Sequence, residues 1–201
     1  MATTHLELLV EEPSMEAFLR GLLPRLLPQD RTFEIHAFQG KEDMLRKLDA
    51  RLRGYVHWLP QHWRILVVID RDDDDCHVLK TRLDRIARDC GLRIACAGWQ
   101  LVNRIAIEEL EAWYFGDWEA VRASYPRVSP SIPDKQAYRN PDAIAGGTWE
   151  AFERILKQHG YFKAGLPKVE VARAIATHIT PGASQSQSFK SFYRAIEDAF
   201  A

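Results

Sequence analysis

The chain has 201 residues, of which 46% are hydrophobic and 27% are charged. This length and composition suit one globular unit and exclude a chain that is disordered throughout. Lysine and arginine (27) nearly balance aspartate and glutamate (28), which leaves a formal net charge of −1. That balance excludes a globally basic nucleic-acid-binding protein, so any such binding must come from a local patch.

Targeting signals are not evident in the sequence. No apolar stretch approaches the roughly 20 residues that a membrane helix needs, and Met1 to Leu6 lacks the basic and apolar regions of a secretory signal. The three cysteines form no CxxC pair, which is typical of reduced thiols. We therefore expect a cytoplasmic protein without a membrane partner.

Strands and helices alternate along the first 100 residues, because apolar side chains recur first at strand spacing and then at helical spacing. The expected order is strand His5–Val10, helix Met15–Leu26, strand Thr32–Phe38, helix Met44–Leu52, strand Arg64–Ile69, helix Leu79–Cys90 and strand Leu92–Ala97. Ser14 is the expected cap of the first helix, and Pro24 should kink or shorten it. This alternation predicts an α/β fold with a mainly parallel sheet flanked by helices.

The second half of the chain has a different texture. Val102–Ile107 predicts one more strand, which runs into an acidic helix over Glu108–Tyr114. Four prolines and a Gly-Gly pair make residues 126–147 a long loop. Three helices should follow, starting near Thr148, Lys168 and Ser188. We expect an α/β core over residues 1–100 and a C-terminal helical extension over residues 101–201, packed together as one compact unit. The apolar stripe of the last helix could close the core or form a homodimer.

Two acidic clusters follow predicted strands. Glu11 and Glu12 end the first strand, and Asp70 to Asp75 end the third. The carboxyl ends of parallel strands lie at one edge of a sheet, where ligands bind. Carboxylates at 4 Å repel by about 4 kcal/mol, and a divalent cation such as Mg²⁺, which prefers oxygen ligands, would offset this repulsion. The alternative is that the aspartates, Asp73 to Asp75 above all, cap the following helix.

These segments resemble the two motifs of Toprim domains. Leu8–Glu16 resembles the first motif, an apolar strand leading to a glutamate and a helix, although Glu12 stands where the family commonly has glycine. Val67–Asp72 resembles the second, an apolar strand ending in DxD. The resemblance implies that Glu11 is a general acid/base or metal ligand, and that Asp70 and Asp72 bind Mg²⁺ or Mn²⁺.

The whole chain is also similar to a family of bacterial proteins, domain-of-unknown-function family 4276. Ile107–Trp113 and Gly147–Glu150 carry that similarity. The family name implies no activity, so it does not choose between functions.

Further candidates follow from the resemblance to Toprim nucleases, which are similar to two-metal enzymes and so need more carboxylates. Glu109 and Glu111 are the candidate metal ligands, although Glu108 and Glu111 share a helical face more easily. The alternative is that these acids only favour a helix N-terminus. Candidate phosphate contacts are the local bases Lys163, Lys168, Arg173 and Arg104. Lys163 is the candidate catalytic lysine, which would stabilise transition-state charge unless it is an ordinary surface lysine.

Three functions compete. The first is a Mg²⁺-dependent Toprim-type nuclease, acting on nucleic acid (DNA rather than RNA), with a partner ATPase in bacterial defence as the resemblance implies. The second is a DxD phosphatase, although such enzymes place the motif on their first strand and here it follows the third. The third is a non-catalytic binding module of Toprim shape. The segment His57–Trp63, rich in histidine and tryptophan, could stack bases or pack as a loop on the sheet.

Overall fold

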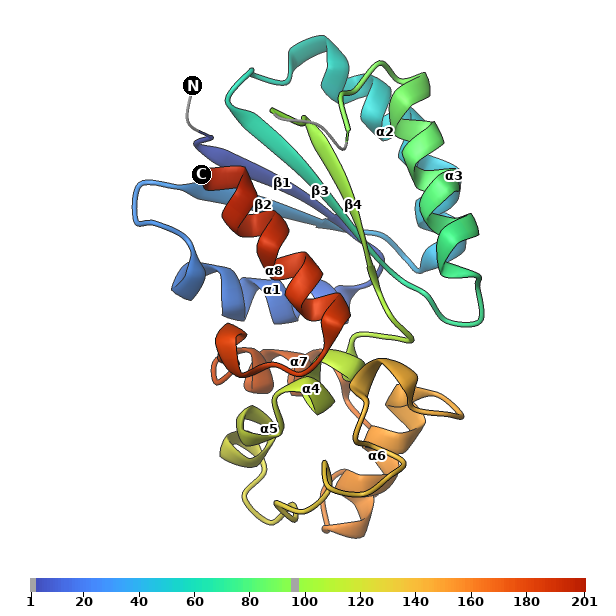
Figure 1. Ribbon diagram of the computed structural model, residues 1–201, viewed down its shortest axis with the longest axis vertical. Coiled ribbons are helices and arrows are strands. Elements are labelled where there is room, and N and C mark those ends of the chain that lie inside the picture. Colours follow the sequence, from blue (N-terminus) through green and yellow to red (C-terminus); the bar gives the residue numbers. More distant parts are fainter. Residues whose placement is uncertain (1–2, 95–97) are drawn as a thin grey trace.

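The computed structural model describes residues 3–94 and 98–201. Within them, four parallel strands form one sheet in the order β2-β1-β3-β4. The strands are β1 (His5–Val10), β2 (Thr32–Ala37), β3 (Trp63–Asp70) and β4 (Leu101–Ala106). Leu8 of β1 pairs with Ile35 of β2 and with Leu66 of β3. The predicted α/β fold with a parallel sheet is confirmed, and all four carboxyl ends point to the same edge (Figure 1).

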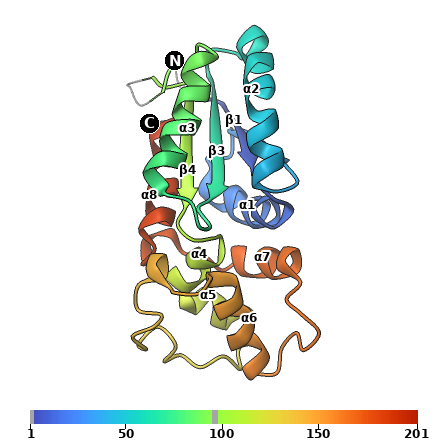
Figure 2. The same cartoon turned by 90° about the vertical axis from the view of Figure 1, so that its right-hand side faces the viewer.

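Helices cover both faces of the sheet (Figures 1 and 2). One face is covered by α2 (Lys41–Trp58) and α3 (Cys76–Asp89), and the other by α1 (Pro13–Leu26) and α8 (Gln187–Phe200). Successive residues of a strand point to opposite faces, so Leu8 packs with α1 while Leu9 packs with α2. Burial on both faces explains why β3 is a continuous apolar run.

The remaining helices gather beyond the carboxyl ends of the strands (Figures 1 and 2). They are α4 (Glu111–Gly116), α5 (Trp118–Ser124), α6 (Thr148–Gln158) and α7 (Lys168–Ala176), with short 3-10 helices at Pro141–Ala143 and Pro181–Ala183. α7 packs closely on α1 at Gly21, where an added Cβ would lie only 2.8 Å from the Cβ of Ala176. These helices therefore form a wall that faces the carboxyl edge of the sheet. We call this the acidic edge, because Glu11 and Asp70 lie there.

The apolar stripe of α8 is used within the chain. Phe189, Phe192 and Ile196 are buried, and the rings of Phe189 and Phe192 pack on Trp113 of α4. The indole nitrogen of Trp113 also donates a hydrogen bond to Ser188 Oγ at 3.0 Å. The stripe thus closes the core, and a homodimer, which stays a prediction, would need another surface.

Several predicted boundaries were wrong. Ser14 does not cap α1, because Glu12 holds the N-cap position and Ser14 Oγ donates to the Glu12 carboxylate. Leu92 to Ile94 are not in a strand, and the rest of the strand predicted there lies outside the described residues. The backbone at Arg93 bonds to Gln100 instead, so β4 alone takes the place beside β3. Pro24 lies in the last turn of α1, which ends at Leu26.

Three other helices differ from expectation. The acidic helix starts at Glu111 rather than Glu108, because Glu108 has a φ of 60°, which a right-handed helix does not allow. α2 runs on to Trp58, so His57 and Trp58 belong to a helix and not to a loop. α5 was not predicted from the sequence.

Over residues 3–94 and 98–201, no helix is both long enough and apolar enough to cross a membrane. Cys76 and Cys90 are free thiols, and Cys96 lies outside the described residues.

Candidate functional site

Glu11 and Asp70 lie side by side at the carboxyl edge of the sheet. Glu11 directly follows β1, and Asp70 is the last residue of the neighbouring strand β3. The backbone N–H of Asp70 donates a hydrogen bond to Glu11 Oε2 at 3.0 Å. Both residues are buried, with 8% and 6% of their surfaces exposed. The structure therefore brings these two predicted site residues together.

The buried carboxylate of Asp70 is not fully hydrogen-bonded within the described structure. Its Oδ1 is buried and has no hydrogen-bond partner among the described residues. Burial, followed by the charge of Glu11, raises the pKa of Asp70 well above its usual value. An ionised carboxylate in such a place is costly unless it is paired. Asp70 must therefore hold a proton or meet a cation.

Asp72 lies on a strained loop that extends the sheet. The N–H of Arg71 donates to Ala106 O, and the N–H of Asp72 donates to Glu108 O, both at 2.9 Å. Asp72 and Glu108 both have left-handed backbones, with φ of 49° and 60°. Such strain in residues other than glycine costs free energy and is typical of functional sites. The side chains of Arg71 and Glu108 form an ion pair that links the two segments.

Lys41 holds the acidic loop, and sequence reasoning missed it. It is the first residue of α2, and its Nζ lies 2.7 Å from Asp72, 2.9 Å from Asp74 and 2.8 Å from the carbonyl oxygen of Arg71. Burial lowers the pKa of Lys41, but the hydrogen bonds to the two aspartates outweigh it and the pKa is raised. Lys41 follows the second strand, so its place after a strand end was the available signal.

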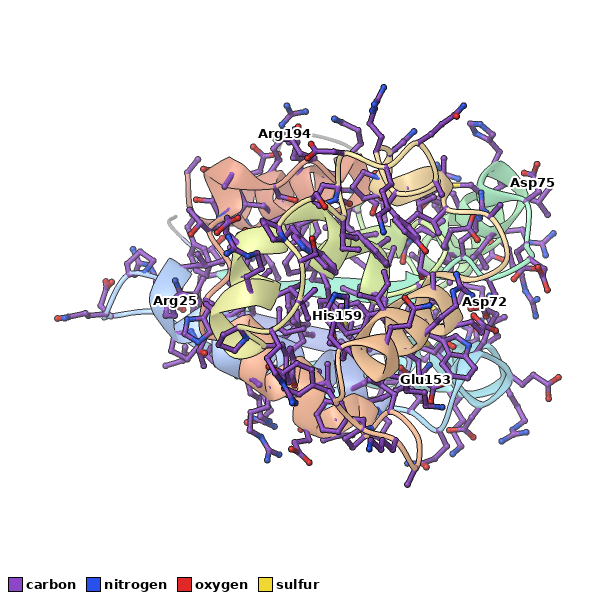
Figure 3. The ribbon with its side chains drawn as sticks, turned by 90° about the horizontal axis from the view of Figure 1, so that it is seen from below. Arg25, Asp72, Asp75, Glu153, His159 and Arg194 are labelled. Atoms are coloured by element: carbon purple, nitrogen blue, oxygen red, sulfur yellow. The ribbon has the colours of Figure 1, made fainter. Side chains whose placement is uncertain are left out.

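The aspartates after Asp72 have separate roles. Asp75 caps α3, because its carboxylate accepts hydrogen bonds from the N–H groups of His77 and Val78 at 2.9 Å. The capping alternative is thus confirmed for Asp75, whereas Asp74 pairs with Lys41. Seen from below, Asp72 and Asp75 lie on one side of the molecule and Arg25 on the opposite side (Figure 3).

Glu111 brings a third buried carboxylate from the helical wall. It is the first residue of α4 and only 2% exposed. Burial raises its pKa to about 7, with the charge of Lys168 acting in the opposite direction. Lys168, the first residue of α7, responds in turn: burial lowers its pKa, but the charges of Glu111 and Glu12 outweigh this and raise it. The positive charge of Lys168 therefore acts on these acids, while its Nζ lies 5.1 Å from the centre of the Trp149 ring.

Glu109 acts on a helix remote in sequence. Its Oε2 accepts hydrogen bonds from Thr148 N at 3.1 Å, Thr148 Oγ1 at 2.9 Å and Trp149 N at 2.9 Å. Glu109 thus satisfies the first N–H groups of α6, as a capping carboxylate does. As a metal ligand it would have to share this oxygen or use the other one. Lys163, the predicted catalytic lysine, is exposed on the turn before α7.

Tyr114 was also missed. Its hydroxyl is buried without a hydrogen-bond partner in the described structure. Burial, followed by the charges of Glu111 and Asp70, raises its pKa well above the usual value. Tyr114 lies three residues after Glu111, on the same face of α4. That spacing was the only signal in the sequence.

Comparisons with known proteins place the chain in a family. Residues 10–197 match the family described as Domain of unknown function (DUF4276). The chain belongs to the DUF4276 family. The match includes strands β2, β3 and β4 and the helical wall, and it confirms the family similarity predicted from the sequence. No curated protein and no solved structure matches the chain, and no match supports the resemblance to Toprim domains.

The acidic edge of this DUF4276 protein fits Mg²⁺ or Mn²⁺ in its donor chemistry. Within the described residues, no three His, Cys, Asp or Glu side chains already form a group that could hold a metal. Mg²⁺, however, is usually bound by only one or two carboxylates together with water and substrate phosphates. The buried, unpartnered Oδ1 of Asp70 is an oxygen of that kind. The residues therefore suit an ion shared with a phosphate rather than an all-protein cage.

A pocket of about 520 Å³ opens beside this edge. Its lining is strongly acidic and consists of Asp72, Asp73, Glu108, Glu109, Gly146, Gly147 and Glu150. An anionic ligand would be repelled from such a lining unless cations accompany it. The lining of the pocket thus suits cations, or an anionic ligand that brings cations with it.

Proposed function

We propose that this protein is a Mg²⁺-dependent enzyme that cleaves phosphodiester bonds in nucleic acid, DNA rather than RNA. The observation that carries the proposal is the buried carboxylate of Asp70, which has an unpartnered oxygen and lies against Glu11 at a ligand-binding edge. The resemblance of Val67–Asp72 to the Toprim DxD motif supports the same chemistry. A DxD loop that ends a buried strand suits phosphoryl chemistry, whether the enzyme is a nuclease or a DxD phosphatase.

In this proposal Asp70 and Asp72 hold the ion, with Glu11 beside them as a further ligand or as a general acid/base. Bound Mg²⁺ would polarise a phosphoryl oxygen and stabilise the charge that develops on it. Glu111, with a pKa of about 7, is suited to accept or donate a proton near neutral pH.

Two lysines complete the proposed machinery. Lys168 adds positive charge where negative charge develops on the phosphate. Lys41 positions Asp72 through their ion pair. The roles of Glu109 and Glu111 as metal ligands and of Lys163 in catalysis stay predictions. The resemblance to Toprim nucleases also supports a partner ATPase in bacterial defence.

Cleavage assays test the proposal. The purified protein is incubated with plasmid, single-stranded DNA and RNA in Mg²⁺ or Mn²⁺, beside Asp70→Asn, Glu11→Gln and the control Glu42→Gln. Glu42 is exposed on α2, so its variant should cleave as the wild type does, while the two site variants should not. Cleavage that survives both site substitutions would contradict the proposal.

The same assays separate the competing functions. Mn²⁺ binding, measured by electron paramagnetic resonance, should weaken in Asp70→Asn whatever the substrate is. Hydrolysis of a simple phosphomonoester that is lost in Asp70→Asn, without cleavage of nucleic acid, would favour a DxD phosphatase. Metal binding without hydrolysis of either substrate would favour a non-catalytic binding module.

A further inference from the structure

A second polar cluster lies under α2, on the sheet face away from α1. Its centre is Glu7, a buried carboxylate in the middle of β1 that is only 5% exposed. Glu7 Oε2 accepts a hydrogen bond from the Tyr55 hydroxyl and is bonded to His36 Nε2, both at 2.7 Å. Glu7 Oε1 lies 3.2 Å from His5 Nε2. The cluster takes no part in the acidic edge described above.

A pocket of about 320 Å³ opens over this cluster. Its lining consists of Glu7, Glu34, His36, Ala50, Arg51, Gly54, Tyr55 and Trp58. Pockets for small ligands start at about 300 Å³, so this one suits a ligand of modest size. It lies at the C-terminal end of α2, whereas Lys41 holds the acidic loop at the N-terminal end of the same helix.

Trp58 presents an aromatic surface to this pocket. Trp58 is the last residue of α2, and 54% of its surface is exposed. Its ring lies 5.2 Å from that of Tyr55 and 5.8 Å from that of Trp63, and the Trp63 ring in turn packs on His5 at 3.9 Å. The indole is thus supported by other rings while more than half of its surface faces solvent. A supported, exposed tryptophan is a platform on which a flat ligand can stack.

The wall beside Trp58 leaves room for such a ligand. Gly54 lies one helical turn before Trp58, and Ala50 one turn before that. A Cβ added at Gly54 would meet no atom within 4 Å. Small side chains in this row keep the pocket open along α2.

The polar groups of the pocket indicate what kind of flat ligand fits. Arg51 already places its guanidinium 5.4 Å from the centre of the Tyr55 ring, so a cation already occupies that ring and Trp58 is the exposed aromatic surface. The lining offers donors, such as Arg51, and acceptors, such as the Glu34 carboxylate, whose hydrogen bonds from Arg20 and Ile35 both reach Oε1. A planar ring with donors and acceptors on its edge matches this set, and nucleobases have that edge.

We propose that the Trp58 pocket binds a nucleobase, which stacks on Trp58 and forms hydrogen bonds with Glu34 and Arg51. The base could belong to a free nucleotide or to an unpaired position in a single strand. The single-strand case rests on the proposed function, whereas the free-nucleotide case does not. The metal site and this pocket involve different residues, so they can be tested apart.

Binding is measured in EDTA, with the wild type and with Asp70→Asn, so that it does not depend on metal or cleavage. The probes are the four 5′-ribonucleoside monophosphates and a 12-residue single-stranded oligonucleotide. Isothermal titration calorimetry measures the binding of each probe. Trp58→Ala removes the platform and Trp58→Phe keeps an aromatic ring. Gly54→Leu fills the pocket and keeps tryptophan at position 58, and leucine favours a helix more than glycine does.

Saturable binding should appear in the wild type and in Asp70→Asn. It should weaken about tenfold or more in Trp58→Ala and Gly54→Leu, and much less in Trp58→Phe. An oligonucleotide that binds far more tightly than the monophosphates would identify a single strand as the source of the base, and equal affinities would identify a free nucleotide. Equal affinity in the wild type and Gly54→Leu, or no saturable binding of any probe, would overturn the proposal.

Discussion

Replacing Glu11 by glutamine should change how the stability of the fold depends on pH. The pKa of Glu11 is raised from 4.5 to about 7, chiefly by burial. The hydrogen bond from the N–H of Asp70 lowers this pKa, and the charge of Asp72 raises it further. The folded chain therefore binds this proton more tightly than the unfolded chain does. Its contribution to stability is complete below pH 4.5 and is lost as the pH rises through 7.

The size of the effect follows from the two pKa values. A rise from 4.5 to about 7 corresponds to about 3 kcal/mol, of which about 2.5 kcal/mol is lost between pH 5 and pH 8. Glutamine can still accept the hydrogen bond from Asp70 but does not ionise. The Asp70 pKa should also fall in this variant, because the charge of Glu11 helps to raise it. Both changes flatten the dependence on pH.

Urea denaturation in EDTA at pH 5, 6, 7 and 8 measures this directly. The wild type should lose stability over that range, and Glu11→Gln should lose about 2 kcal/mol less, which corresponds to about 4–8 °C in Tm for a chain of this size. Glu42→Gln, an exposed variant, should follow the wild type. Mg²⁺ added at pH 8 should stabilise the wild type more than Glu11→Gln. Parallel profiles for the wild type and Glu11→Gln would refute the argument from burial.

Three further predictions concern the groups around the site. Glu109→Ala should lower the free energy of unfolding by about 1–2 kcal/mol, since α6 loses its cap; an equal loss in the exposed variant Glu119→Ala would contradict this. Lys41→Met should lower the free energy of unfolding by about 1 kcal/mol in EDTA, and added Mg²⁺ should stabilise this variant more than the wild type. Thermal denaturation at several Mg²⁺ concentrations measures both effects, and an equal Mg²⁺ effect on the two proteins would contradict the prediction. Lys168→Gln should raise the pKa of Glu111 above 7, because Lys168 lowers it, as followed by carboxyl NMR titration with Lys163→Gln as the control; an unchanged Glu111 pKa would show that Lys168 does not act on it.

Local pattern was enough for most of the fold. Three of the described strands were found because each is an apolar or alternating run, and β4 was found as Val102–Ile107. The extra strand at Leu92–Ala97 was wrong at Leu92–Ile94, since an apolar stretch shows only that a segment can be buried and not what it pairs with. Glu108 begins no helix because its φ is positive, a property that its residue type does not reveal.

Sequence and tertiary structure likewise determined different parts of the candidate site. Glu11 and Asp70 could be placed together from sequence alone, because parallel strands bring their carboxyl ends to one edge and each acid directly follows an apolar strand. Tertiary structure decided their partners. Lys41 reaches Asp72 from the start of α2, and the charge of Lys168, on α7, acts on Glu111. Such contacts join residues far apart in the chain, and their charges act across a buried space that only the packing of the helical wall on the sheet creates.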